Sequence, residues 1–242
     1  MQTPLVRTES PQDLIDGIDY PYVDGKPLAE NTKQLEWILL LTGNLKALFE
    51  SDPNVFVSSD QLWYPVKGRP DICYAPDVYV VFGRPKGHRL SWKQWQENDT
   101  PLTVVVEILS PGNSLAEAGD KLEFYSQHGV EEYYTYEPDE NRFVVYTRGQ
   151  ILLRRERCPD DRYTSPRMGV HFDWSGETLR VTYPDGRPFL TLYEMDQLRR
   201  EAERQRDVAE ARFARLALLA QRVTAGTATP EEVAEFQRLV SG

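Results

Sequence analysis

The spacing of hydrophobic positions changes along this chain between the three-and-four spacing of helices and the short apolar runs of strands. Residues 29–50 carry leucines and one isoleucine at helical spacing, and Asn31 or Thr32 is placed to cap this helix. A second helix is predicted over residues 114–128, because Gly129 follows it in the usual C-terminal position. Apolar runs predict strands at 54–57, 61–64, 77–82 and 104–109.

Further strands are predicted at 133–136 and 143–146, joined by a turn at 138–141. The order strand, helix, strand over residues 104–136 predicts a crossover that lays its two strands side by side. Short strands near 151–155 and 178–183 would extend the sheet or form a rim. Residues 1–25 are rich in Pro, Asp and Tyr and are typical of an irregular arm.

The pattern changes again after residue 191. Gln205 and Arg212 interrupt the apolar heptad seam, so the coiled-coil signal is weak, and Thr229 begins a last short helix. The seam itself consists of Met195, Leu198, Ala202, Ala209, Leu216, Leu219 and Val223. We therefore predict a domain over residues 1–191 and an amphipathic helical tail over 192–242 that docks or self-associates.

Length and composition narrow the class of protein. The chain has 242 residues, of which 40% are hydrophobic, and it lacks an apolar run of the ~20 residues that a membrane span needs. Cys73 and Cys158 are far apart, which favours a reducing cytoplasm. We find no glycine-rich phosphate loop and expect no nucleotide cofactor. The net charge of −10 argues against a broad nucleic-acid surface but leaves room for a local cleft.

Cations and aromatic residues are mixed in the long connection 83–101. Such a segment could contact a polyanion or a base. A surface loop with a tryptophan packed onto the body is the interpretation we favour, because the other rests on composition alone.

A glutamate stands inside the apolar strand 104–109. Four of the five residues flanking Glu107 in this strand are β-branched, which is typical of a central strand. Burying a carboxylate there costs on the order of several kcal/mol unless a cation, a metal or hydrogen bonds compensate its charge. Glu107 is therefore either part of a functional site or a partner of a helix lysine.

Three residues make a candidate catalytic site. Asp77 opens one predicted strand and Glu107 lies inside another, and neighbouring strands are about 4.8 Å apart, so both carboxylates could share one Mg²⁺. Lys121, on the following helix, could orient a water or stabilise charge on a phosphate. Taken singly, Asp77 could be a turn residue before its strand and Lys121 a solvated lysine.

The residues around this site resemble a known family. Asp77, the run 107–111 (Glu-Ile-Leu-Ser-Pro), the run 121–125 (Lys-Leu-Glu-Phe-Tyr) and the run 129–134 (Gly-Val-Glu-Glu-Tyr-Tyr) resemble the Uma-two family of bacterial restriction endonuclease-like proteins, within the PD-(D/E)XK nuclease superfamily. The resemblance covers roughly residues 20–195 and is most specific over 104–138.

This resemblance implies an α/β fold, a restriction-endonuclease-like core with a mixed central sheet flanked by helices. It also implies hydrolysis of DNA that depends on Mg²⁺, with Mn²⁺ able to substitute, in which Asp77 and Glu107 bind the metal. The superfamily pattern has its lysine two residues after the acid, where this chain has Leu109, so the resemblance implies that the lysine has moved to Lys121. Such nucleases often carry a further acid near the first helix, for which Glu30 is a better candidate than Glu36.

Two other functions stay open. The chain could be a catalytically inactive nuclease-fold module for binding or assembly, or a nuclease that acts on RNA or on branched DNA. A homodimer is expected by analogy, because two sites related by symmetry cut both strands most simply.

Overall fold

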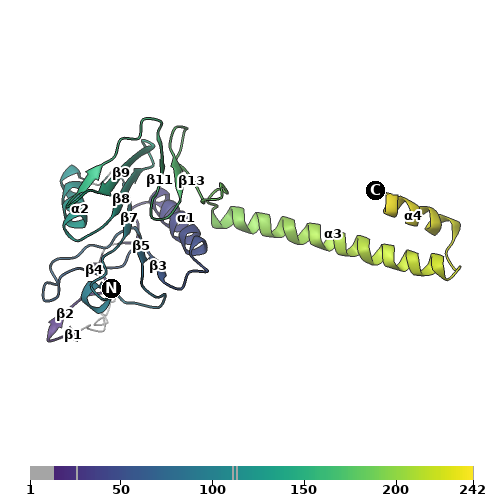
Figure 1. Ribbon diagram of the computed structural model, residues 1–242, viewed down its shortest axis with the longest axis horizontal. Helices are drawn as coiled ribbons and strands as arrows, with labels where there is room; N and C mark the ends of the chain where they lie inside the picture. The colour runs from purple at the N-terminus through teal and green to yellow at the C-terminus, as the bar shows by residue number, and fades with distance from the viewer. Residues whose placement is uncertain (1–13, 26, 111, 113, 242) are drawn as a thin grey trace, which may run out of the picture. The chain divides into compact units, whose positions relative to one another are not determined.

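The computed structural model describes residues 14–25, 27–110, 112 and 114–241, and over these residues a six-stranded sheet forms the centre of the first unit (Figure 1). Strand β7 lies inside the sheet, parallel to β8, and its other neighbour β5 is antiparallel to it. The predicted mixed α/β sheet is thereby confirmed. The order across the sheet is β10 (Leu153–Arg155), β9 (Arg142–Arg148), β8 (Glu132–Glu137), β7 (Val104–Ile108), β5 (Val78–Phe82) and β3 (Val55–Ser58).

The connection between the parallel strands is helix α2 (Leu115–Gln127). The side chain of Ser114 caps it by accepting the backbone N–H of Glu117. Gly129 follows the helix with a φ of +98°, a conformation that favours glycine, and lets the chain turn back into β8. The predicted crossover is confirmed, and it places α2 over one face of the sheet.

Helix α1 (Thr32–Leu48) covers the opposite face of the sheet from α2 (Figure 1). Its cap is Asn31, whose side chain accepts the Gln34 N–H. Because side chains alternate along a strand, Val104 and Val106 pack in the core on the α1 side, whereas Val105 packs in the core on the α2 side. Residue 107 therefore faces α2.

Several short strands were not predicted, or were predicted in another place. The segment near 178–183 forms β13 (Arg180–Thr182), which belongs to a separate three-stranded sheet with β11 (Arg162–Thr164) and β12 (His171–Asp173) rather than to the central sheet. This sheet packs on the α1 side of the core. The strand predicted at 61–64 forms as β4 (Trp63–Tyr64), and the remaining short elements are β1 (Leu14–Ile15), β2 (Ile18–Asp19), β6 (Trp92–Lys93) and the 3-10 turn η1 (Gln94–Gln96). The predicted arm lies mostly outside the described residues.

The cations of the connection 83–101 are held by the protein itself. Arg84 and Arg89 both bind Glu97, at 2.9 and 2.6 Å, and the Arg89 guanidinium also lies over the ring of Trp92. The side chain of Trp92 is fully buried. The segment is a surface loop with a packed tryptophan, as we favoured.

A second unit, Leu190–Gly242, consists of a helical hairpin. Helix α3 (Leu192–Thr224) begins with a capping box between Thr191 and Glu194, and α4 (Pro230–Ser241) packs against its C-terminal part. Among the described residues, no helix has both the length and the apolar character that crossing a membrane requires.

The hydrophobic core suggests that the first unit folds without the second. Apart from Leu219, the buried apolar residues all belong to the unit that ends at Phe189. We predict that a chain ending at Phe189 unfolds cooperatively within a few degrees of the full chain in a thermal melt followed by near-UV circular dichroism. Loss of the near-UV signal in the shortened chain would contradict this.

Candidate active site

Asp77 and Glu107 face each other across neighbouring strands. Val78 of β5 is paired with Val106 of β7, so Asp77 and Glu107 occupy the next opposed positions on the face covered by α2. The backbone N–H of Ile108 donates a hydrogen bond of 2.7 Å to Asp77 Oδ2. The register of two strands, rather than a loop, therefore positions both carboxylates.

Helix α2 supplies the partners of the buried carboxylate. Glu107 is 1% exposed, and its Oε2 accepts from Lys121 Nζ at 2.8 Å. Its Oε1 accepts from the Tyr125 hydroxyl at 2.6 Å. Lys121 and Tyr125 are four residues apart and so share one face of the helix. The cost of burying Glu107 is thus offset by an ion pair and by a charge-assisted hydrogen bond from a neutral hydroxyl.

Burial and neighbouring charges affect the protonation of Asp77 and Lys121 differently. Burial raises the pKa of Asp77 well above its ordinary value, and the charge of Glu107 raises it further, against the opposing effects of the Ile108 N–H and the Lys121 cation. Burial by itself would lower the pKa of Lys121, but the charges of Glu107 and Asp77 outweigh burial and raise it. Lys121 is therefore held as a cation, whereas Asp77 resists ionisation.

Glu30 contacts the site only through intermediates. Its carboxylate accepts a hydrogen bond from the Ser110 hydroxyl, and its backbone N–H donates to Gln34 Oε1 at 2.8 Å. Gln34 in turn donates to the carbonyl of Ile108 at 2.9 Å and also hydrogen-bonds Asp77. Glu30 thus fixes the segment after β7, and the structure does not bring it to the two site carboxylates.

The donor set suits a hard cation. Each carboxylate oxygen has two lone pairs, so Glu107 retains acceptor capacity after Lys121 and Tyr125 have bound it. Mg²⁺ is commonly held by one or two carboxylates with waters and phosphate oxygens. Over the part of the chain that the structure describes, no group of three or more His, Cys, Asp or Glu residues could hold a metal. Asp77 and Glu107 are a pair of carboxylates and do not form such a group.

The structure brings together three of the four residues singled out from the sequence. Lys121 has a side chain only 16% exposed, so it is not a solvated helix lysine. Two further members were missed, Tyr125 and Gln34. Gln34 lies on the buried stripe of α1 with Ile38, and a polar residue at an apolar position of a helix was the signal that could have revealed it.

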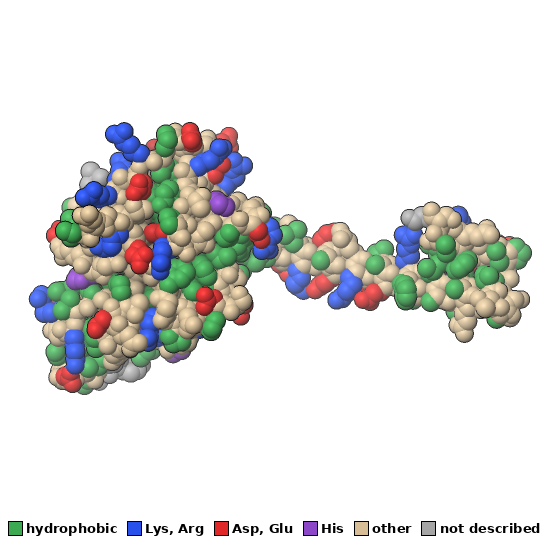
Figure 2. All heavy atoms as spheres, in the orientation of Figure 1, with side chains coloured by type: hydrophobic (Ala, Val, Ile, Leu, Met, Phe, Trp, Pro, Cys, Tyr) green, Lys and Arg blue, Asp and Glu red, His purple; other side chains and the backbone are tan. Residues whose placement is uncertain are grey.

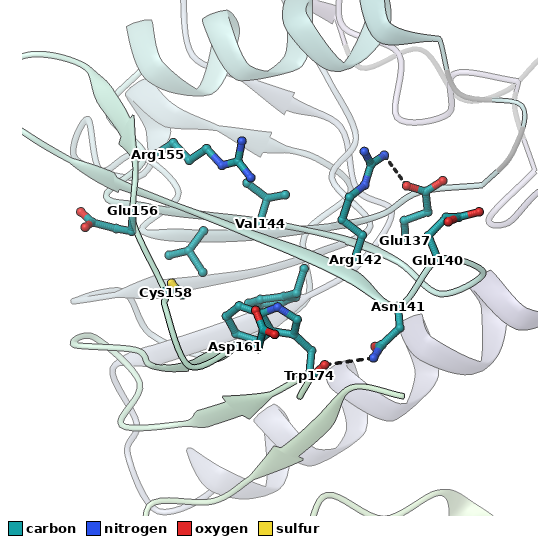
Figure 3. Close-up of a pocket in the computed structure, with 12 residues that line it drawn as sticks. Glu137, Glu140, Asn141, Arg142, Val144, Arg155, Glu156, Cys158, Asp161 and Trp174 are labelled. Carbon is teal, nitrogen blue, oxygen red and sulfur yellow. Dashed lines mark hydrogen bonds and ion pairs between the residues drawn. The ribbon is translucent and has the colours of Figure 1, made fainter. Parts of the chain in front are cut away.

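A groove elsewhere in the first unit does not belong to this cluster. It has a volume of about 680 Å³, and its lining comes from the end of β8, β9, β10 and the segment that leads to β11, together with Trp174 just after β12 (Figure 3). Four carboxylates line it with two arginines, one of which is paired with Glu137. This charge balance does not favour the phosphate backbone of a nucleic acid.

Comparison with known proteins assigns the chain to a family. The model of the Uma2 family, described as "Putative restriction endonuclease", matches residues 9–182. The chain belongs to this family, and the resemblance noted in the sequence is confirmed. No curated protein matches the chain.

A similar solved structure comes from Anabaena variabilis ATCC 29413 and is described as a "putative nuclease belonging to DUF820". It is 14% identical, and the match covers 64% of this chain and 81% of that chain with a TM-score of 0.40.

The raised pKa of Asp77 leads us to predict how the stability of the protein depends on pH. The folded chain binds this proton more tightly than the unfolded chain, so stability falls as the pH rises above the ordinary range of an aspartate, about 4. Asp77→Asn retains an acceptor for the Ile108 N–H and removes the charge. We expect it to raise the free energy of unfolding at pH 7 by on the order of 1 kcal/mol and to have no such effect below about pH 4.

Urea denaturation at both pH values measures this difference. Asp71→Asn is the matched control, because Asp71 is exposed and its Arg69 partner lowers its pKa, so this change should not stabilise the protein. A loss of stability in Asp77→Asn that is equal at both pH values would rule out the electrostatic account.

Proposed function

We propose that this protein is a metal-dependent endonuclease that hydrolyses phosphodiester bonds of DNA, with Mg²⁺ bound by Asp77 and Glu107. The observation that carries the proposal is the charge of the cluster. Asp77, Glu107 and Lys121, when all are ionised, leave one net negative charge in a largely buried place. Burial and then repulsion from Glu107 raise the pKa of Asp77, and a divalent cation would offset the negative charge and favour the ionised form of Asp77. Mn²⁺ should substitute, since it also prefers oxygen ligands.

Each residue then has a defined role. When bound, the metal would lower the pKa of a coordinated water and offset charge on the phosphate. Glu107 and Asp77 hold their carboxylates on one face of the sheet, and Tyr125 fixes the orientation of Glu107 through its hydroxyl. Lys121 keeps its proton next to Glu107 and supplies a positive charge to the reacting phosphate. Gln34 and Glu30 position the backbone at Ile108 and Ser110.

Family membership supports DNA as the substrate, because the family is described as a restriction endonuclease. The acidic chain, with a net charge of −10, would bind DNA weakly outside the site, so its affinity should depend on metal and on a few cations near the site. A homodimer is the form in which we expect the enzyme to cut both strands.

Metal binding and cleavage together test this function. We predict that Mg²⁺ or Mn²⁺ titrated into the protein gives a calorimetric binding signal that Glu107→Ala abolishes, and that the wild type nicks plasmid DNA only with metal. Glu131→Ala is the control. Glu131 lies just before β8 and is a half-exposed carboxylate paired with Arg167. Full cleavage by Glu107→Ala would end this mechanism.

The role of Lys121 can be separated from that of the metal ligands. We predict that Lys121→Met lowers the cleavage rate at saturating metal by about 10²-fold or more, the loss seen when one charge-stabilising donor is removed. Metal affinity should rise rather than fall, because a competing cation has gone. Lys67→Met, which removes an exposed lysine paired with Asp16, should leave the rate unchanged. A normal rate in Lys121→Met would assign the lysine to folding alone.

A catalytically inactive module for binding or assembly is the second candidate. The observation in its favour is that the Lys121 ammonium binds the buried Glu107 carboxylate at 2.8 Å, as in a structural ion pair. If neither metal binding nor cleavage is detected in a folded wild type, this candidate replaces the first.

A further inference from the structure

Helix α3 exposes large apolar side chains over most of its length. Leu198 is 58% exposed and Phe213 is 73% exposed. In Figure 2, blue and red side chains mark the half of α3 nearer residue 192, and green side chains gather where α3 and α4 pair. Several charged residues in the first half of α3 bind one another within the helix, as in the pairs Arg199–Glu203 and Arg206–Glu210. These pairs make the helix soluble but leave its apolar stripe uncovered.

Helix α4 covers a different side of α3. Arg215 binds Glu235 of α4 at 2.6 Å, and Arg212 donates to the Leu239 carbonyl at 3.3 Å. Leu219 is fully buried. Residues 212, 215 and 219 follow helical spacing and so define the side that faces α4. The heptad seam read from the sequence is therefore divided, because Arg212 and Leu219 serve the hairpin rather than a seam with another helix.

The apolar residues beside that side form a stripe of their own, which we call the α3 stripe. Its spacings are 3, 4, 7, 4 and 3 residues, so it keeps to one side of the helix and reads the same from either end. Large residues stand at both ends and small ones at the middle. The stripe consists of Met195, Leu198, Ala202, Ala209, Phe213 and Leu216.

We propose that the α3 stripe binds the α3 stripe of a second copy of this chain, with the two helices antiparallel and a two-fold axis between Gln205 and Arg206. Reversal then pairs large with large and small with small: Leu198 faces Phe213 of the second copy, and Ala202 faces Ala209 of the second copy. The alanine layers allow the two helices to approach closely at the centre. This inference does not depend on the proposed nuclease activity.

The charged residues beside the stripe favour the antiparallel orientation of the two helices. Arg199, Glu203, Arg206 and Glu210 are spaced 4, 3 and 4 residues apart and so line one flank of the stripe. In an antiparallel pair each flank meets the same flank of the other helix in reverse order. The signs plus, minus, plus, minus then meet their opposites, with Arg199 next to Glu210 and Glu203 next to Arg206 of the second copy.

Polar groups at the centre of the proposed helix pair can also form hydrogen bonds. Gln205 donates its amide to Glu201 at 3.0 Å within the helix, which leaves its carbonyl oxygen as an acceptor. Near the two-fold axis this oxygen lies close to Gln205 of the second copy, whose amide has a second N–H to donate. The polar residue that weakens a heptad seam thus fits an antiparallel pair and fixes its register.

Sedimentation equilibrium of the full chain tests the proposal. We expect a dimer in the wild type, and we expect Phe213→Glu to raise the dimer dissociation constant by at least about 100-fold, because the symmetry places the change twice in the interface. Tyr193→Glu is the matched control: Tyr193 is an aromatic residue of α3 that is 70% exposed and does not belong to the stripe. A monomeric wild type, or equal effects of the two variants, would overturn the proposal.

Cysteine cross-linking tests the orientation. Two chains of different tag length, one with Ala202→Cys and one with Ala209→Cys, should form a mixed disulfide when mixed and oxidised. Each variant alone should give no more cross-link than the wild type, which reports the background from Cys73 and Cys158. Self-cross-linking of Ala202→Cys to an extent equal to the mixed pair would indicate parallel helices and overturn the antiparallel arrangement.

Discussion

The buried carboxylate of Glu107 imposes a constraint that most of the first unit satisfies. A charge inside a central strand needs partners on the face toward which it points, and that face is covered by α2, which supplies Lys121 and Tyr125. Helix α2 can lie there because β7 and β8 are parallel and need a crossover between them. The position of the charge, the parallel pair and the helix that joins it are therefore one arrangement. The proposed chemistry adds Asp77, which lies just before the neighbouring strand β5.

The sequence predicts this part of the structure well because each signal is local. Alternation along the strand assigns Glu107 to the face of Val105, and Ser114 and Gly129 mark the two ends of α2. By contrast, the set of contacts around Glu30 depends on pairing between segments some 80 residues apart. Strand pairs of two residues, such as β1 with β2, have no periodicity to detect and are defined by the partner alone.

Packing against α4 also determines which side of the correctly predicted helix α3 is left exposed. The seam in α3 was read as one heptad pattern, but α4 takes Leu219 and Arg212 for the hairpin. Which side of a long helix is free depends on the neighbour that packs against it, and a single chain's sequence does not state that neighbour. The α3 stripe can be identified only after the residues that face α4 have been set aside.

The strand register at Asp77 has a consequence for how this protein can change over evolution. The long connection between β5 and β7 can gain or lose residues on the surface, since its ends are fixed by the pairing of Val78 with Val106. One residue inserted within either strand would turn every later side chain to the opposite face and separate the two carboxylates. Insertions and deletions among homologues should therefore fall in the connection and spare the two short strand segments.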